Sequence, residues 1–169
     1  MDIVPEILNR FSVREFTAGP VEKSKIENII NAGTLAPSAK NRQEWRFIIV
    51  QKPELKEKIK DASFGQDFVG QAAAIIAVCT TNIDYIMPNG ELSYPIDCTF
   101  AASHMMLQAT REGLGSCCIT TFDNEDVKRI LQLPFKMKIV MLILVGHTKA
   151  QPVDKSRKKI GRVSSYNHW

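Results

Sequence analysis

The segment Arg10-Phe11-Ser12-Val13-Arg14-Glu15-Phe16 is the stretch of sequence around which the predicted fold is organised. In an extended chain, successive side chains point to opposite sides. The two arginines and the serine would then line one side, and the first phenylalanine and the valine the other. Two guanidinium groups flanking a hydroxyl match the oxygens of a phosphate group. We therefore predict a phosphate-binding strip with an apolar back; a strand with a solvated basic face is the alternative.

Composition and charge are those of an ordinary globular protein. The 169 residues are 44% hydrophobic and 24% charged, which predicts one domain spanning residues 1–169. The formal net charge is +4, and much of it lies in a basic cluster between Lys155 and Arg162. A cluster of this kind suits a nucleic acid, an anionic membrane or one small phosphorylated ligand.

The sequence predicts a cytoplasmic protein. The four cysteines show no C-x-x-C spacing, and Cys117 and Cys118 are adjacent, so reduced thiols are expected. The first residues lack a basic segment followed by an apolar run, so no signal peptide is expected. The longest apolar run, residues 139–145, has the length of a strand, so no membrane association is expected.

Hydrophobic periodicity predicts alternating helices and strands. Helices are expected at residues 2–9, with Asp2 as N-cap, and at 22–32, 53–62, 96–112 and 123–131. Strands are expected at residues 45–50, 73–79, 116–121 and 138–145. The last strand is apolar on both faces and is expected at the centre of the sheet. Residues 81–94, which contain Pro88-Asn89-Gly90, are expected to form a loop.

Two segments predict contact with a second copy of the chain. The helix expected at 96–112 carries apolar residues nearly all the way round, so it must be covered on both sides. The tail, residues 149–169, is polar and basic but ends in Tyr166 and Trp169. We expect this tail to pack on another surface, for which a partner subunit is one candidate.

No motif of a self-sufficient active site is present. The sequence lacks G-x-G-x-x-G, G-x-x-x-x-G-K-[ST], G-x-S-x-G and H-E-x-x-H. The three histidines are far apart in sequence, and no metal site is expected. No nucleophile–base pair or pair of carboxylates stands out. A phosphate-binding strip without such groups suits an enzyme whose reactive centre is a bound cofactor.

The strip R-x-S-x-R-x-F, followed by A-P-S-A-K-N-R-Q-E-W at residues 36–45, resembles the nitroreductase family of flavin enzymes. The resemblance continues through residues 113–119 and 139–146 to the basic tail, so it covers nearly the whole chain. It implies an α+β fold, a three-layer sandwich in which helices flank a central mixed, mainly antiparallel sheet. It also implies an intertwined homodimer with one FMN in each of two sites at the subunit interface.

The residues that match FMN-binding positions of the family fall into four groups. The positions that hold the phosphate and ribityl chain are Arg10, Ser12 and Arg14. The basic pair that closes on the phosphate is Lys155 and Arg157. The loop that reaches the ring from the partner subunit contains Pro37 and Ser38, with Asn41 at the ring's polar edge. The segment whose backbone passes near the reactive flavin nitrogen contains Cys118, Ile119, Thr120 and Thr121.

The resemblance implies a ping-pong reaction in which the flavin carries the chemistry and no side chain is catalytic. NADH or NADPH delivers a hydride and leaves, and a small acceptor such as a nitroaromatic compound or a quinone then binds the same face. Arg42 or Lys40 is a candidate for a positive charge near the ring, and a solvated loop position is the alternative for both. Many relatives have Pro where this chain has Glu44, and larger ones have Glu-Gly in place of Thr120-Thr121. No role of an acidic side chain is therefore carried over.

Two other functions remain open. A flavin-binding protein of the same fold would use a non-nicotinamide donor or modify the flavin itself. A nucleic-acid-binding module would use the basic tail, but the sequence contains no recognised motif of that class, and no nucleic-acid partner is expected.

Overall fold

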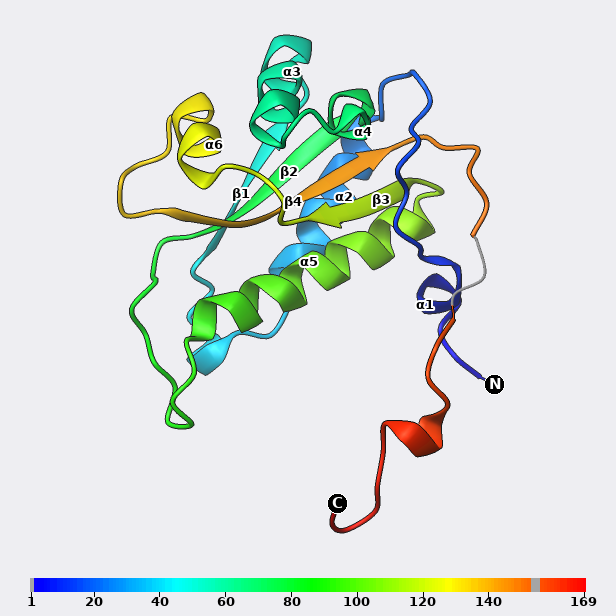
Figure 1. The fold of residues 1–169 in the computed structure, drawn as a ribbon, viewed down its shortest axis with the longest axis vertical. Coiled ribbons are helices and arrows are strands. Elements are labelled where there is room, and N and C mark those ends of the chain that lie inside the picture. Colours follow the sequence, from blue (N-terminus) through cyan, green and yellow to red (C-terminus); the bar gives the residue numbers. More distant parts are fainter. Residues whose placement is uncertain (1, 153–155) are drawn as a thin grey trace.

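The protein is built on one four-stranded sheet with helices on both faces (Figure 1). The computed structural model describes residues 2–152 and 156–169. The strands in these residues are β1 (Trp45–Val50), β2 (Ala74–Thr80), β3 (Gly115–Ile119) and β4 (Lys138–Gly146). The helices are α1 (Pro5–Asn9), α2 (Lys23–Thr34), α3 (Pro53–Ala62), α4 (Asp67–Gln71), α5 (Ser93–Arg111) and α6 (Asn124–Ile130), with short 3₁₀ helices η1 (Ala39–Asn41) and η2 (Ile160–Arg162).

The sheet has the order β1-β2-β4-β3, and every neighbouring pair of strands is antiparallel. Each residue of β2 is buried, and β4 is buried from Met141 to its end. The central position predicted for residues 138–145 is therefore confirmed. The parallel component of the sheet comes from an isolated bridge between Ser12 and Ser116, outside the four strands.

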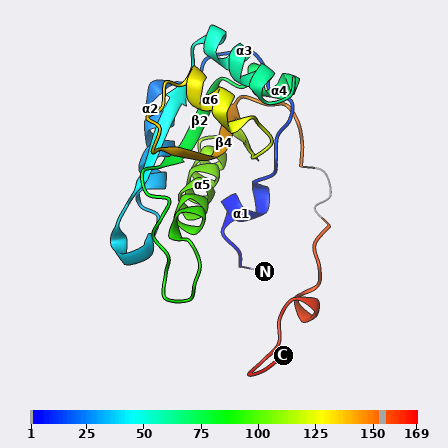
Figure 2. The ribbon, with the colours of Figure 1, turned by 60° about the vertical axis from the view of Figure 1, so that its left-hand side comes forward.

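Two hydrophobic cores, one on each face of the sheet, give the molecule three layers. α2 and α5 share one core with Ile76 and Val78 of β2. α3, α4 and α6 share the other core with Ile75 and Ala77, the alternate residues of the same strand. Figures 1 and 2 show the two groups of helices on opposite sides of the sheet. The predicted α+β three-layer sandwich is confirmed.

The strands and longer helices lie close to the predicted ranges, and two details differ. The first helix begins at Pro5 with Val4 as N-cap, so the predicted start and cap at Asp2 are wrong. The fixed φ angle of proline suits the first helical position, which explains the later start. The sequence does not predict α4, because its five residues are too few to show a helical period.

Apolar residues of α5 and of the segment around α1 stay exposed. Ile96 and Phe100 of α5 are 40% and 46% exposed, and Val4 and Ile7 near α1 are 56% and 52% exposed. The buried residues of α5 face α2 and the sheet, so the predicted cover is in place on that side. None of the helices in the described residues combines the length and apolar character that a membrane span requires.

The segment 10–17, which contains the strip, packs on a pair of glycines at the paired ends of β3 and β4. Gly115 and Gly146 are register partners across the two strands. A Cβ atom at Gly115 would lie 2.8 Å from Cγ2 of Val13, and one at Gly146 would lie 2.9 Å from Cδ1 of Phe16. Both apolar side chains are buried. The missing side chains of the two glycines therefore let the strip lie directly on the sheet.

We expect Gly146→Ala to lower the free energy of unfolding by about 1–3 kcal/mol, the usual cost of overpacking. The ideal Cβ position at Gly146 lies 2.9 Å from the Phe16 ring and 3.0 Å from the backbone nitrogen of Ala73. Gly161→Ala is the matched control, because nothing lies within 4 Å of its Cβ position. Equilibrium unfolding in urea measures the stability of both variants. Equal midpoints would contradict the conclusion that Gly146 makes room for Phe16.

Candidate functional site

The strip is an extended segment that runs from the outer edge of β3 to the end of β4. The backbone nitrogen of Val13 donates to the carbonyl oxygen of Ser116 at 3.0 Å, and that of Thr17 donates to His147 at 2.8 Å. Val13 is buried, whereas Ser12 and Arg14 are exposed. The predicted alternation of sides is confirmed from Ser12 to Arg14, whereas Arg10 and Phe11 are both half-buried.

Both arginines of the strip influence the pKa of one buried thiol. Burial raises the pKa of the Cys117 thiol, and the guanidinium groups of Arg14 and Arg10 offset part of that rise. Cζ of Arg14 also lies 5.8 Å from the ring centroid of Phe68 in α4. Arg10 is half-buried and Arg14 exposed, so the strip presents a concentrated positive charge beside β3.

The segment Cys118–Thr121 continues along β3, away from the strip. Cys118 is half-buried and Ile119 is buried, whereas Thr120 and Thr121 are exposed. Burial raises the pKa of the Cys118 thiol to about 11, so this group is a neutral packing residue at ordinary pH. The six residues from Ser116 to Thr121 are separated by five steps, which span about 16 Å at the rise of a strand.

Sequence reasoning missed a loop that lies beside Thr121. The side-chain nitrogen of Gln66 donates to the carbonyl oxygens of Ser63, at 2.9 Å, and Thr121, at 3.2 Å. Phe64 in this loop is 70% exposed and has a φ of 58°, which is uncommon for an aromatic residue. The feature of the sequence that could have predicted this loop is the glycine of the Phe64-Gly65 pair, shortly after the end of the helix expected at 53–62.

The loop that contains Pro37, Ser38 and Asn41 lies at the other end of α5. The backbone nitrogen of Ala39 donates to the Asp97 carboxylate at 2.9 Å. Thr110, in contrast, lines a cavity together with Arg10. Asp97 and Thr110 are about 20 Å apart along the helix axis. Figure 1 shows this loop and the strip at opposite ends of α5, so one copy of the chain does not bring them together.

Backbone strain is concentrated in this loop. Lys40, Asn41 and Gln43 have φ angles of 53°, 53° and 54°, in the left-handed region that costs a residue with a side chain on the order of 1–3 kcal/mol. The hydroxyl oxygen of Ser38 accepts a hydrogen bond from the Gln43 nitrogen at 3.0 Å and stabilises the turn.

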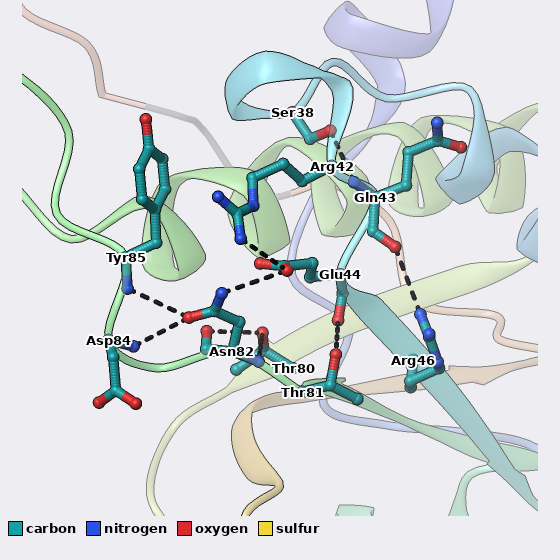
Figure 3. Close-up of polar contacts among 10 residues, drawn as sticks. All are labelled: Ser38, Arg42, Gln43, Glu44, Arg46, Thr80, Thr81, Asn82, Asp84 and Tyr85. Carbon is teal, nitrogen blue, oxygen red and sulfur yellow. Dashed lines mark hydrogen bonds and ion pairs between the residues drawn. The ribbon is translucent and has the colours of Figure 1, made fainter.

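Glu44 connects the strained loop to the loop at residues 81–92 (Figure 3). Its carboxylate accepts hydrogen bonds from Arg42 at 3.4 Å and from the side chain of Asn82 at 3.2 Å. Its carbonyl oxygen accepts from the backbone nitrogen of Thr81 at 3.1 Å. Glu44, which stands where many relatives have Pro, thus supplies a carboxylate that forms hydrogen bonds with both loops.

The basic tail is placed only in part. Lys155 lies outside the described residues. Arg157 is exposed, and its guanidinium donates to the neighbouring Ser156 carbonyl at 3.0 Å. Figure 2 shows residues 156–169 running away from α1 and the sheet, and Tyr166 and Trp169 are 88% and 95% exposed. Packing of the tail on another surface stays a prediction.

Two cavities differ in their relation to the strip. A cavity of about 150 Å³ lies behind it, lined by Arg10, Ser116 and neighbouring residues. The Ser116 hydroxyl is buried and has no hydrogen-bond partner among the residues that the structure describes. A larger cavity of about 540 Å³ lies between α2 and β1, with Ile30 and Ile49 in its lining. It is on the opposite edge of the sheet from β3 and is lined by none of the predicted site residues.

Known proteins resemble this chain over most of its length. The sequence profile of the nitroreductase family matches residues 7–80 and 63–147. A protein of Thermus thermophilus named NADH dehydrogenase is 27% identical over 194 residues, which cover 96% of this chain and 95% of the relative.

Solved structures extend the likeness to the fold. A nitroreductase family protein from Clostridium difficile is 28% identical, with both chains covered completely and a TM-score of 0.88. The NADPH:FMN oxidoreductase of Vibrio harveyi, solved in complex with NAD⁺, is 25% identical, with a TM-score of 0.87 over 98% of this chain and 76% of that one. The profile match includes the strip and all four strands, and this chain therefore belongs to the nitroreductase family.

Proposed function

We propose that this protein is an FMN-dependent oxidoreductase that oxidises NADH or NADPH and reduces a small acceptor such as a nitroaromatic compound or a quinone. The observation that carries the proposal is the strip, in which Ser12 and Arg14 are exposed and Arg10 is half-buried, while Val13 and Phe16 are held on the sheet. FMN would supply the reversible two-electron chemistry that the protein's own side chains lack. The names of the Thermus and Vibrio relatives support an enzyme of this class.

The groups on the strip fit a phosphate. Arg10 and Arg14 lie two residues before and two residues after Ser12, which adds a neutral donor. Each charge-assisted hydrogen bond contributes about 1.5–3 kcal/mol. We propose that Lys155 and Arg157 complete the phosphate site when the tail packs on it.

The remaining part of the proposed site lies along β3. We propose that the backbone of Cys118, Ile119, Thr120 and Thr121 borders the flavin ring. The side chains there include no carboxylate, amine or imidazole, so the segment's role is to position the ring and exclude water from one side.

A second copy of the chain completes the site in this proposal. Pro37, Ser38 and Asn41 lie too far from the strip, across the length of α5, to contact the same ligand in one copy. The exposed apolar residues of α1 and α5 offer a surface for association. We therefore propose a homodimer in which this loop reaches the FMN held by the partner's strip.

Residues 1–169 are proposed to form one FMN-binding domain. The four free thiols are compatible with a reducing compartment, and a cytoplasmic location is part of the proposal.

The proposed function predicts a yellow protein. An absorption spectrum of the purified protein is expected to show bound flavin, and anaerobic NADH or NADPH should bleach it. A flavin spectrum that only dithionite bleaches would favour a donor other than nicotinamide. A colourless protein that does not bind added FMN would refute the phosphate strip.

Replacement of a strip arginine should weaken FMN binding. We expect Arg10→Ala and Arg14→Ala each to raise the FMN dissociation constant roughly 10- to 150-fold, the equivalent of one charge-assisted contact. Lys58→Ala removes the same charge from an exposed position on α3 and serves as control. Flavin fluorescence titration measures all three, and unchanged affinity in both arginine variants would exclude the assignment.

Association and FMN retention should be lost together. Phe100→Asp places a charge on the exposed apolar side of α5 and is expected to give a monomer that loses its flavin. Phe135→Asp is the control, since Phe135 is 92% exposed and lies outside α1 and α5. Light scattering after gel filtration measures the mass, and a Phe100→Asp dimer with full flavin content would contradict the proposed interface.

A further inference from the structure

Two cations of the strained loop lie over one aromatic ring of the loop at residues 81–92. Nζ of Lys40 lies 5.4 Å and Cζ of Arg42 lies 4.5 Å from the ring centroid of Tyr85. Both basic residues are exposed, whereas Tyr85 is half-buried. Two like charges on one ring repel each other, and an anion bound between them would remove that cost.

The carboxylates nearby compensate only part of this charge. Glu44 forms an ion pair with Arg42 at 3.4 Å, but it shares the same oxygen with the side chain of Asn82. Figure 3 shows the Asp84 carboxylate directed away from the Arg42 guanidinium. Lys40 has no ion-pair partner within residues 2–152 and 156–169. Lys40 is therefore the less compensated of the two cations beside the Tyr85 ring.

The cations are held in place at an energetic cost. Lys40 itself and its neighbour Asn41 have left-handed backbone conformations, as does Gln43 after Arg42. Hydrogen bonds from Ala39 to Asp97 and from Gln43 to Ser38 maintain the turn. Strain of this kind persists where the surrounding structure over-determines it, and it clusters at ligand-binding positions.

We propose that Lys40, Arg42 and Tyr85 form a docking site for the phosphates of the nicotinamide dinucleotide. This inference rests on the proposed function, in which the same loop borders the flavin ring. When the nicotinamide of a dinucleotide stacks on the flavin ring, its diphosphate has to lie on the protein surface next to that ring. Guanidinium and ammonium groups bind phosphate oxygens, and each of the two cations also contacts the Tyr85 ring.

Glu44 sets the strength of this site. The oxidised dinucleotide has to leave before the acceptor binds the same face of the flavin. A pair of cations without a compensating carboxylate would bind its phosphates too tightly and slow its release. The carboxylate lowers the local positive charge and fixes the orientation of Arg42 through their ion pair. Glu44 is thus a positioning residue, and its neutralisation should strengthen binding of phosphorylated donors.

The test uses the FMN-loaded protein and a series of donors that differ in phosphate content. Stopped-flow bleaching of the flavin is followed anaerobically with NADPH, NADH, reduced nicotinamide mononucleotide and phosphate-free 1-benzyl-1,4-dihydronicotinamide. Arg42→Ala and Lys40→Ala should lower the second-order rate constant for NADH and NADPH roughly 10-fold or more, in line with loss of a charge-assisted contact. The effect should shrink with the mononucleotide and vanish with the phosphate-free donor.

Two further variants complete the design. Glu44→Gln keeps an acceptor oxygen for Asn82 but removes the negative charge, and it should raise the rate constant for the dinucleotides alone. Lys58→Ala, an equal charge change on α3, should leave all four donors unaffected. The flavin content of each variant is measured from its visible absorption before the reaction.

The outcomes separate this inference from the function on which it rests. An equal loss with all four donors in Arg42→Ala would overturn the phosphate site, because the cation would then act on the flavin. No difference between Arg42→Ala, Lys40→Ala and Lys58→Ala would overturn it as well. Failure of every donor to bleach the unchanged, flavin-loaded protein would instead refute the proposed nicotinamide-dependent function.

Discussion

The contact between the strip and the paired glycines Gly115 and Gly146 is the constraint on which the proposed phosphate site depends. Val13 and Phe16 occupy the space that side chains at these glycines would fill. Backbone hydrogen bonds to Ser116 and His147 set the register of the segment. Because side chains alternate in an extended chain, a slip of one residue would bury the cations and expose the apolar side. The order of charges along the strip can form a phosphate site only because the contact with the two glycines fixes which side of the strip faces outward.

The other half of the proposed site depends on strain rather than on burial. The middle of the loop, residues 40–43, is exposed and carries left-handed residues, so its conformation needs support from neighbouring segments. That support comes from Asp97 at the start of α5 and from the contact of Glu44 with Asn82. Glu44 thereby couples the geometry of this loop to residues 81–92.

In the proposed enzyme, activity depends on dimer formation, because the strip and the Ser38 loop lie at opposite ends of α5. The strip is near the C-terminal end of the helix and the Ser38 loop is near its N-terminal end (Figure 1). One long, rigid helix therefore prevents a monomer from assembling the whole site. The same helix exposes Ile96 and Phe100, which belong to the surface that a second copy would cover.

The sequence alone was enough for the strands, the longer helices and the sides of the strip, because these follow from local periodicity and from alternation in an extended chain. The four strand ranges were confirmed to within a few residues, and the helix expected at 123–131 is present, with the Asp123 carboxylate as its N-cap. Tertiary structure decided which distant residues meet. The contact of Asn82 with Glu44 joins residues 38 positions apart, and nothing in the local pattern of either segment specifies it. The same holds for the contacts of Tyr85 with Lys40 and Arg42, because such contacts depend on how the sheet and α5 place the ends of two loops.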